Sequence, residues 1–323
     1  MKIESKTVML YVALLLAGFG IGVLFYSNRE SCDSALFKYI NHELVCKDKM
    51  VVRKSNYVEF KRNMERFIQD KKKENKVTNV AIYFRDLQNG PTLGINEYEK
   101  FSPASLLKLP LFLAYLGLSI ENDKLLETEI AFRGNTLAQE QYFKPSKSAE
   151  NNIPYTINEL LGFMIKYSDN NSYYVLLEYL GQISPDEDIL KDTFIDLGII
   201  DPKDFLEQTL TVKSYSAIFT QLYHNSFFTQ KELSEKALSL LTESDFYQGI
   251  ISGVPVDLKV ANKFGERSLP NNIKQLHDCG IIYYPENPYL LCVMTQGRDF
   301  TELISVIREI SKLVYDEFNS RKL

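Results

Sequence analysis

The sequence predicts an α+β domain whose mostly antiparallel sheet of about five strands is built from both ends of the chain and flanked by helices. Two observations lead to this prediction. Strand patterns lie shortly after residue 77 and again after residue 257, and an all-helical region with its own caps lies between them. Because the strands are separated by helices rather than alternating with them, we expect one sheet into which the helical region is inserted.

The composition is ordinary for a globular protein of this length. The chain has 323 residues, of which 45% are hydrophobic and 24% are charged. The formal net charge is −5, so we do not expect a nucleic-acid partner. The three histidines are scattered and no C-x-x-C or H-E-x-x-H motif occurs, so we expect no metal site and no cofactor.

The N-terminus carries an uncharged run of 20 residues, Thr7–Tyr26. As a helix this run would cross a hydrocarbon core of ~30 Å. A cleaved signal peptide is the alternative, but its apolar region is usually shorter and is followed by a small-residue cleavage site. We therefore expect residues 1–30 to be a retained, single-pass anchor in the cytoplasmic membrane. Lys2 and Lys6 precede the run, which favours export of the remaining chain.

Residues 31–76 are expected to form a juxtamembrane segment and a first helix. Phe60, Met64 and Phe67 recur at helical spacing, which predicts an amphipathic helix over Asn56–Lys73. Its basic face either is simply solvated or lies near anionic lipid headgroups.

The four cysteines fall into two local pairs, Cys32 with Cys46 and Cys279 with Cys292. Two local disulfides agree with an exported protein in an oxidising compartment. Four buried thiols in a reduced protein are the alternative.

The first elements of the domain are two strands and an apolar helix. Thr78–Leu87 is a strand pattern, and a Gln-Asn-Gly-Pro turn joins it to a second strand at Thr92–Ile95. Ser105–Ile120 is apolar almost all round and should be a central helix. Pro110 within it indicates a local distortion.

Further helices are signalled by their caps. Thr156 and Glu159 form one capping box, and Thr229 and Glu232 form a second. Another helix is expected to start at Thr211. The remaining expected elements are three strands and a terminal helix: Leu258–Phe264, Gly280–Tyr284, Tyr289–Thr295 and Phe300–Phe318.

Ser105 and Lys108 lie three residues apart at the start of the apolar helix and therefore share one face. Such a pair arises by chance about once in a chain this rich in serine and lysine. Its context points to chemistry, because burial lowers the pKa of a lysine and a neutral amine can take a proton from a neighbouring hydroxyl. The sequence thus presents a candidate nucleophile and its base.

Two further triplets follow in order. Ser168-Asp169-Asn170 offers a hydroxyl and an amide for proton transfer and substrate contact, although it also suits a simple helix cap. Lys263-Phe264-Gly265 offers a cation for a substrate carboxylate and a glycine that lets a substrate backbone approach. A strand with one solvated lysine is the alternative.

Together the three triplets resemble the S-x-x-K, S-D-N and K-T-G motifs of class A β-lactamases and penicillin-binding proteins. The resemblance extends from about Thr78 to the C-terminus and includes the order of strands and helices. It implies a β-lactamase-like serine hydrolase domain over residues 77–323.

The resemblance implies a role for each matching residue. Ser105 would be the acylated nucleophile, Lys108 its general base and Ser168 the proton relay. Asn170 would contact the substrate amide, and Lys263 would attract the substrate carboxylate. The backbone N–H groups of Ser105 and Glu266 would form the oxyanion hole, in which one donor is worth ~3–4 kcal/mol.

Two positions depart from the family pattern. Phe264 stands where the family usually has a hydroxyl residue that helps to bind the carboxylate. The glutamate that activates the deacylating water in class A enzymes has its nearest match in Glu207, within Glu-Gln-Thr-Leu rather than E-x-x-L-N. Glu207 is either this base or a surface glutamate, and without a base the acyl-enzyme would turn over slowly.

Three functions are compatible with these residues. The first is a membrane-anchored β-lactamase whose catalytic domain lies outside the cytoplasm. The second is a penicillin-binding, D-alanyl-D-alanine peptidase-like enzyme that deacylates slowly and acts on peptidoglycan-like substrates. The third is a binding module without catalysis, and the retention of all five motif residues argues against it.

Overall fold

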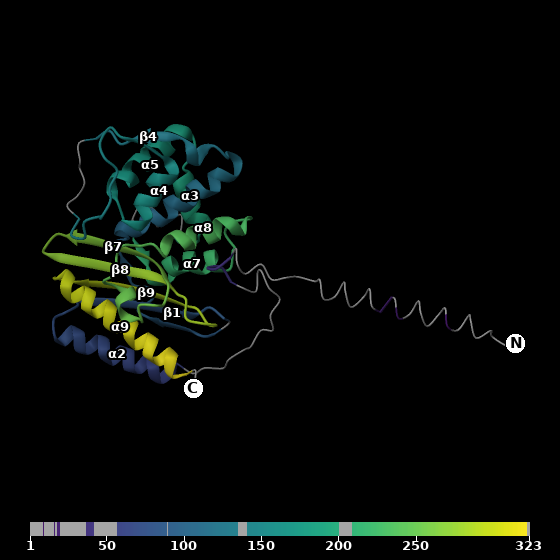
Figure 1. Ribbon diagram of the computed structural model, residues 1–323. Helices are drawn as coiled ribbons and strands as arrows, with labels where there is room; N and C mark the ends of the chain where they lie inside the picture. Colours follow the sequence, from purple (N-terminus) through teal and green to yellow (C-terminus); the bar gives the residue numbers. More distant parts are fainter. Residues whose placement is uncertain are drawn as a thin grey trace.

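A five-stranded antiparallel sheet forms the centre of the computed structural model (Figure 1). The structure describes residues 37–41, 57–88, 90–134, 141–199 and 209–321, with four isolated positions before residue 20. The pair Cys32/Cys46 and Glu207 are outside the described residues, as is the expected anchor Thr7–Tyr26 apart from those four positions.

The strands run in the order β2-β1-β9-β8-β7, and every neighbouring pair is antiparallel. Their bounds are β1 Asn79–Asp86, β2 Thr92–Ile95, β7 Val260–Leu269, β8 Ile273–Ile282 and β9 Tyr289–Gly297. Strands from the first and last parts of the chain therefore pair in one sheet, as predicted.

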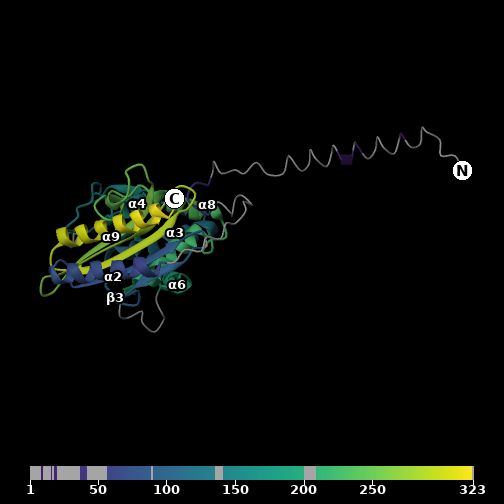
Figure 2. The same cartoon turned by 90° about the horizontal axis from the view of Figure 1, so that it is seen from below.

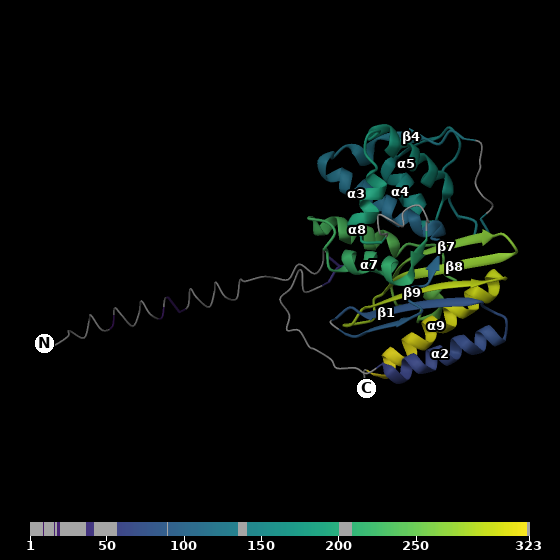
Figure 3. The same cartoon turned by 180° about the vertical axis from the view of Figure 1, so that it is seen from behind.

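Helices cover both faces of the sheet. On one face α2 (Val58–Lys73) and α9 (Phe300–Ser320) lie side by side (Figure 2). On the other face α7 (Val212–Tyr223) and α8 (Lys231–Leu241) lie next to the sheet. Three of the inserted helices lie beyond them (Figure 3): α3 Lys108–Glu121, α4 Ile157–Lys166 and α5 Asn170–Ile183. The fourth, α6 (Ile189–Asp196), packs against α3.

Short elements complete the domain. Three 3₁₀ turns and two small two-stranded ladders are described: η2 Ala104–Leu107, η3 Leu125–Glu127, η5 Ile250–Gly253, β3 Lys100–Phe101 with β6 Leu210–Thr211, and β4 Glu129–Ala131 with β5 Pro154–Thr156.

Two hydrophobic clusters, one on each side of the sheet, form the core. In β1 the buried Val80 and Ile82 contribute to the cluster beneath α2 and α9, whereas Ala81 contributes to the cluster beneath α7. Successive side chains of a strand point to opposite faces, so a strand covered on both sides is apolar throughout. This two-sided burial fixes the sheet against the helical region, and the candidate site lies where they meet.

One stretch of the described residues, Ala104–Glu121, is long and apolar enough to span a membrane. Leu109 to Leu116 on α3 are buried within the domain, so this stretch serves as the predicted central helix. Pro110 is the third residue of α3, where its missing N–H has no intrahelical partner to lose. The helix itself begins at Lys108, after the η2 turn, rather than at Ser105.

The second predicted capping box is wrong. Helix α8 begins at Lys231 after Gln230, and no side chain caps it. Glu232 is then the second helical residue instead of the third, so it lies out of register with Thr229. The first box is confirmed, since Thr156 and Glu159 exchange the expected hydrogen bonds.

A disulfide joins Cys279 on β8 to Cys292 on β9, which face each other in the ladder. This confirms the second of the two predicted cysteine pairs.

Candidate active site

The turn η2 presents Ser105 at the junction between the sheet and α3. Ala104, the residue before it, has a φ of 49°, in the left-handed region that costs energy for a residue with a side chain. The Leu106 N–H donates to Pro103 O at 3.0 Å and closes the turn. Strained backbone persists only where surrounding contacts impose it, so this geometry holds the serine in one orientation.

The side chain of Lys108 lies beside Ser105 and is buried. Its Nζ is 3.0 Å from Ser105 Oγ, and the residue is 2% exposed. Burial, and then the positive charge of Lys263, lower the pKa of Lys108 well below its ordinary value. A lysine held neutral at hydrogen-bond distance from a hydroxyl can accept its proton.

Ser168 and Asn170 both contact the amine of Lys108. Lys108 Nζ lies 2.5 Å from Ser168 O, 3.2 Å from Ser168 Oγ and 2.6 Å from Asn170 Oδ1. Ser168 has a φ of 54° and is fully buried, and Asn170 is the first residue of α5. The predicted triplet therefore meets the predicted pair in space, 60 residues further along the chain.

Asp169 fixes the backbone between Ser168 and Asn170 at the start of α5. Its buried carboxylate caps α5 by accepting the N–H groups of Asn171 and Ser172, and it also accepts the N–H of Ala149. The hydroxyls of Ser148 and Ser172 donate to it as well. The capping interpretation of this triplet is thus correct for Asp169, while its two neighbours face Lys108.

Lys263 approaches Ser168 from the sheet. Its Nζ donates to Ser168 Oγ at 2.9 Å and to Phe264 O at 2.8 Å, and the side chain is 1% exposed. Burial lowers the pKa of Lys263 to about 7, although the charge of Asp278 opposes this effect. Ser168 Oγ consequently lies between two amines, a geometry that suits a proton relay.

Gly265 and Glu266 follow on β7. A Cβ on Gly265 would lie 3.1 Å from both Leu106 N and Pro103 O, so this glycine lets the turn of Ser105 approach the strand. That substrate also approaches here stays a prediction, as does the oxyanion role of the Glu266 N–H. The Glu266 carboxylate accepts the Phe143 N–H at 2.8 Å, and burial raises its pKa.

A pocket of about 770 Å³ opens beside Ser105 and is called the Ser105 pocket below. Its described lining comes from η2, α3, α5, β7 and the adjoining loops: Pro103, Ala104, Ser105, Leu107, Lys108, Gln141, Asn170, Tyr173, Tyr174, Leu177, Glu266, Arg267, Ser268, Leu269 and Pro270. The tyrosines and leucines give it an apolar wall, and Arg267 provides an exposed cation. The pocket has room for a small acyl donor.

The sequence did not predict a set of contacts that fixes Ser102, three residues before Ser105. The Ser102 N–H donates to Gln275 Oε1 at 3.0 Å, and its carbonyl accepts from His277 Nε2 at 3.0 Å. Arg267 donates to its hydroxyl at 2.7 Å. The sequence offered only one signal, a run of polar residues that we did not recognise as part of a strand.

Gln275→Leu should slow the reaction of Ser105 with an acyl donor by about tenfold, because small misplacements of reacting groups are costly. It should also lower the free energy of unfolding by about 1–3 kcal/mol, since the Ser102 N–H would be left unpaired. Single-turnover kinetics and urea unfolding measure the two effects.

Ser102→Ala is the matched control, because it removes only the bond to the exposed Arg267. Both quantities should stay close to those of the wild type. If Gln275→Leu left the acylation rate unchanged at saturating donor, Gln275 would have no positioning role.

Stability should rise between about pH 7 and pH 10, the window set by the two buried amines. In the folded state the pKa of Lys263 is about 7 and that of Lys108 also lies below its ordinary value, 10.5 for a lysine. The unfolded chain therefore binds more protons in this window, and the free energy of unfolding increases with pH. Thermal midpoints at pH 7, 8 and 9 measure the slope.

Lys263→Met should reduce this slope, and Lys312→Met, at an exposed position on α9, should leave it unchanged. Equal slopes in all three proteins would show that Lys263 titrates normally. The raised pKa of the buried Tyr215 acts in the opposite direction only above its ordinary value of 10.

The described residues contain no group of three or more histidine, cysteine, aspartate or glutamate side chains that could hold a metal ion. The sequence-based expectation that the reaction uses no metal or cofactor stays a prediction.

The chain is similar to known proteins in sequence and in fold. The model of a family described as "Beta-lactamase enzyme family" matches residues 60–318. A protein of Bacteroides uniformis named "Beta-lactamase" is 21% identical over 282 residues, covering 82% of this chain and 93% of that protein.

Two solved structures share the fold. A mutant of PBP-A, solved as an acyl-enzyme complex with penicillin G, has a TM-score of 0.67 at 18% identity and covers 84% of this chain and 100% of that one. The extended-spectrum beta-lactamase TLA-3 has a TM-score of 0.68 at 19% identity and covers 81% of this chain and 99% of that one.

Proposed function

The chain belongs to the beta-lactamase enzyme family, and we propose that it is a serine hydrolase that opens β-lactam rings through an acyl-enzyme on Ser105. One observation carries this proposal. Lys108 Nζ lies 3.0 Å from Ser105 Oγ and 3.2 Å from Ser168 Oγ, and burial favours its neutral form. A base, a nucleophile and a relay are therefore in contact before any substrate binds.

The proposed reaction begins when Ser105 Oγ attacks the amide carbonyl carbon and its proton passes to Lys108 Nζ. The carbon–nitrogen bond then breaks, and the leaving nitrogen takes a proton from Ser168 Oγ. Ser168 regains a proton from Lys108, whose amine is neutral again. The positive charge of Lys263, 2.9 Å from Ser168 Oγ, favours transient negative charge on that oxygen.

Water then releases the acyl group as a carboxylic acid and restores Ser105. Glu207 is the base that we propose for this step from the family resemblance. Among the described lining of the Ser105 pocket, Glu266 is the one carboxylate, and it accepts the Phe143 N–H. The departure of Glu207 from the E-x-x-L-N pattern favours a second candidate function, a penicillin-binding enzyme in which deacylation is slow.

The two functions differ in the lifetime of the acyl-enzyme. The full chain in mild detergent is mixed with penicillin G, and its intact mass is followed over time. A β-lactamase gives a transient adduct with substrate consumption, and Glu207→Gln prolongs the adduct. A penicillin-binding enzyme gives a persistent adduct. Both adducts must disappear in Ser105→Ala.

Absence of an adduct with any acyl donor would contradict both enzymatic functions. The chain would then be a binding module on the same fold, the third function compatible with its sequence.

We also propose that Thr7–Tyr26 anchors the protein in the cytoplasmic membrane with the hydrolase domain outside the cytoplasm. The uncharged run and the disulfide between Cys279 and Cys292 support this, because disulfides persist in oxidising compartments. Retention in membranes after alkaline carbonate extraction, with the domain accessible to protease in spheroplasts, is the expected result. Release by carbonate would contradict the anchor.

A further inference from the structure

One cation of the Ser105 pocket has no acidic partner among the described residues. Arg267 of β7 is exposed, and the hydrogen bond that the structure records for it runs from Nη1 to Ser102 Oγ at 2.7 Å. A guanidinium has several N–H donors, so others remain for an anion. The second cation of the described lining, Lys108, is buried and already contacts the motif residues. Arg267 is therefore the cation of this lining that a bound anion can reach.

Lys263, Gly265 and Arg267 lie on the same face of β7, because successive side chains of a strand alternate. Lys263 bonds Ser168 Oγ, whereas Gly265 packs against the turn that presents Ser105. Arg267 is two residues further along, about 7 Å beyond Gly265 at the usual rise of a strand. The face of β7 thus passes Ser168 first, the turn of Ser105 next and Arg267 last.

This order separates the two sides of the bond that breaks. In the proposed reaction the leaving nitrogen takes its proton from Ser168, so the leaving group lies on the Ser168 side of Ser105. Ser168 and Lys263 are not among the described residues that line the Ser105 pocket. The acyl group is attached to the same carbonyl carbon and extends away from the leaving nitrogen, toward Arg267. The Ser105 pocket is therefore the one that receives the acyl group.

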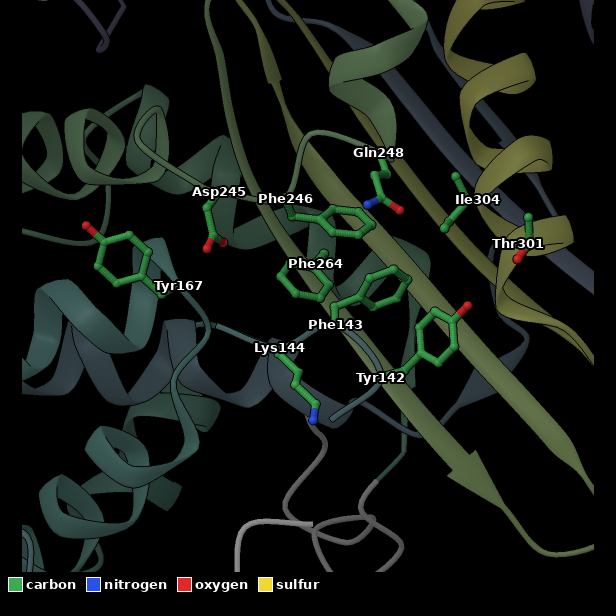
Figure 4. Close-up of a pocket in the computed structure, with 10 residues that line it drawn as sticks. All are labelled: Tyr142, Phe143, Lys144, Tyr167, Asp245, Phe246, Gln248, Phe264, Thr301 and Ile304. Atoms are coloured by element: carbon green, nitrogen blue, oxygen red, sulfur yellow. The ribbon is translucent and has the colours of Figure 1, made fainter. Parts of the chain in front are cut away.

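A second pocket, of about 470 Å³, lies next to the first and does not have Ser105 in its described lining (Figure 4). Three phenylalanines are grouped in it: Phe143, Phe246 and Phe264. The segment Gln141–Phe143 separates the two pockets and crosses the cleft. Gln141 Nε2 donates to Ser168 O at 3.2 Å on the helical side, and the Phe143 N–H donates to Glu266 Oε1 at 2.8 Å on the sheet side. An acyl group on Ser105 consequently meets the lining of the first pocket.

The lining of the Ser105 pocket suits an acyl group that is both aromatic and negatively charged. Helix α5 contributes Tyr173, Tyr174 and Leu177, an apolar wall against which a ring can pack. The one carboxylate of the described lining is that of Glu266, which is adjacent to Arg267 in β7. Its side chain therefore leaves the opposite face of the strand, where it accepts a backbone N–H.

We propose that Arg267 binds a carboxylate in the acyl part of the donor and so makes the enzyme favour amides whose acyl group is anionic. This inference rests on the proposed acyl transfer to Ser105. It assigns Arg267 as a specificity-determining residue, and the carboxylate that it binds is not the one that the family resemblance assigns to Lys263. Arg267 contacts the donor away from the reacting atoms, so its bond contributes to donor binding rather than to the chemical step.

Penicillin G and carbenicillin form a matched pair of donors for the test. They share the bicyclic ring, its carboxylate and a phenyl group, and carbenicillin has one additional carboxylate, in the acyl part. The full chain in mild detergent is mixed with each donor at several concentrations, and acylation of Ser105 is followed by intact mass. Arg267→Gln should lower the ratio of the second-order acylation rate constants, carbenicillin over penicillin G, by about tenfold. The change should be in the half-saturating concentration of carbenicillin, with its limiting rate unchanged.

Two further variants serve as controls. Arg298→Gln removes the same charge at an exposed position after β9, outside the described lining of the Ser105 pocket, and should leave the ratio unchanged. Arg267→Lys keeps the charge and should retain most of the ratio. Both donors are measured with each protein, so the intrinsic reactivity of a donor and any loss of folded enzyme cancel when the ratios of two proteins are compared.

Three results would overturn the inference while leaving acyl transfer intact. If Arg267→Gln changed neither donor, Arg267 would not bind the donor at all. If it slowed both donors equally, Arg267 would bind the ring carboxylate that they share, on the leaving side. If Arg298→Gln lowered the ratio as much, the effect would come from the overall charge of the protein. Failure of both donors to acylate the wild type would instead contradict the proposed function, and this inference with it.

Discussion

Lys108→Met should slow acylation of Ser105 by about 10²–10⁴-fold, the usual contribution of a positioned general base. The amine is 3.0 Å from Ser105 Oγ, and among the described residues no other side chain lies within hydrogen-bond distance of this oxygen. Methionine fills a similar volume, so the change removes the proton acceptor without opening a large cavity. Single-turnover acylation by penicillin G, followed by intact mass, measures the effect.

Lys312→Met provides the control, because this lysine pairs with Asp316 on the exposed face of α9. Its acylation rate should equal that of the wild type. A loss of less than threefold in a folded Lys108→Met protein would mean that another group deprotonates Ser105.

Asp169→Ala should lower the free energy of unfolding by about 3 kcal/mol or more, because buried groups that bond a charged partner lose much when left alone. The carboxylate accepts from three backbone N–H groups and two hydroxyls, and it joins the loop at Ser148 and Ala149 to the start of α5. Urea unfolding monitored by circular dichroism measures the change.

Asp188→Ala is the matched comparison for this substitution. Asp188 also caps a helix, α6, but it is exposed, and among the described residues its carboxylate accepts only the Lys191 N–H. Asp188→Ala should lower the free energy of unfolding by about 1 kcal/mol, as is usual for the loss of a helix N-cap. If the two variants were equally destabilised, the additional bonds of Asp169 would contribute nothing.

Much of the fold was predictable because its strands and helices repeat apolar residues at regular spacing. The sheet of five strands is confirmed, and β2 has the predicted bounds. The largest error is β8, which begins at Ile273 although the strand was expected from Gly280. Its first half contains Gln275, His277 and Asp278, polar side chains that the alternation rule assigns to solvent.

These polar residues are buried because they have partners that are distant in sequence. Asp278 accepts from Asn262 Nδ2 and the Ile250 N–H, and His277 bonds Ser102 O. Burial of polar groups is tolerated where hydrogen bonds replace water. The pattern of polar and apolar residues within one strand does not depend on such distant partners. The burial of Gln275, His277 and Asp278 therefore could not be predicted from it.

In the candidate site, too, some features were predictable from the sequence and others depend on tertiary packing. The order and types of the motif residues were readable, but the contacts of Lys108 with Ser168 and of Lys263 with Ser168 depend on tertiary packing. Gln141–Phe143 has no periodicity and no capping signal, so nothing in its sequence indicated that it crosses the cleft. Phe264 is visible in the sequence as a departure from the family motif, but its contacts with Phe143 and Phe246 depend on tertiary packing.

The position of β9 in the sheet has a consequence for the timing of enzyme formation. This strand lies between β1 and β8, and its Gln296 bonds Thr78 across 218 residues of sequence. During synthesis β1 therefore lacks this neighbour until Tyr289–Gly297 has left the ribosome. Contacts so distant in sequence also form slowly. The site around Ser105 rests on this sheet, so we expect it to form only after β9 has been synthesised.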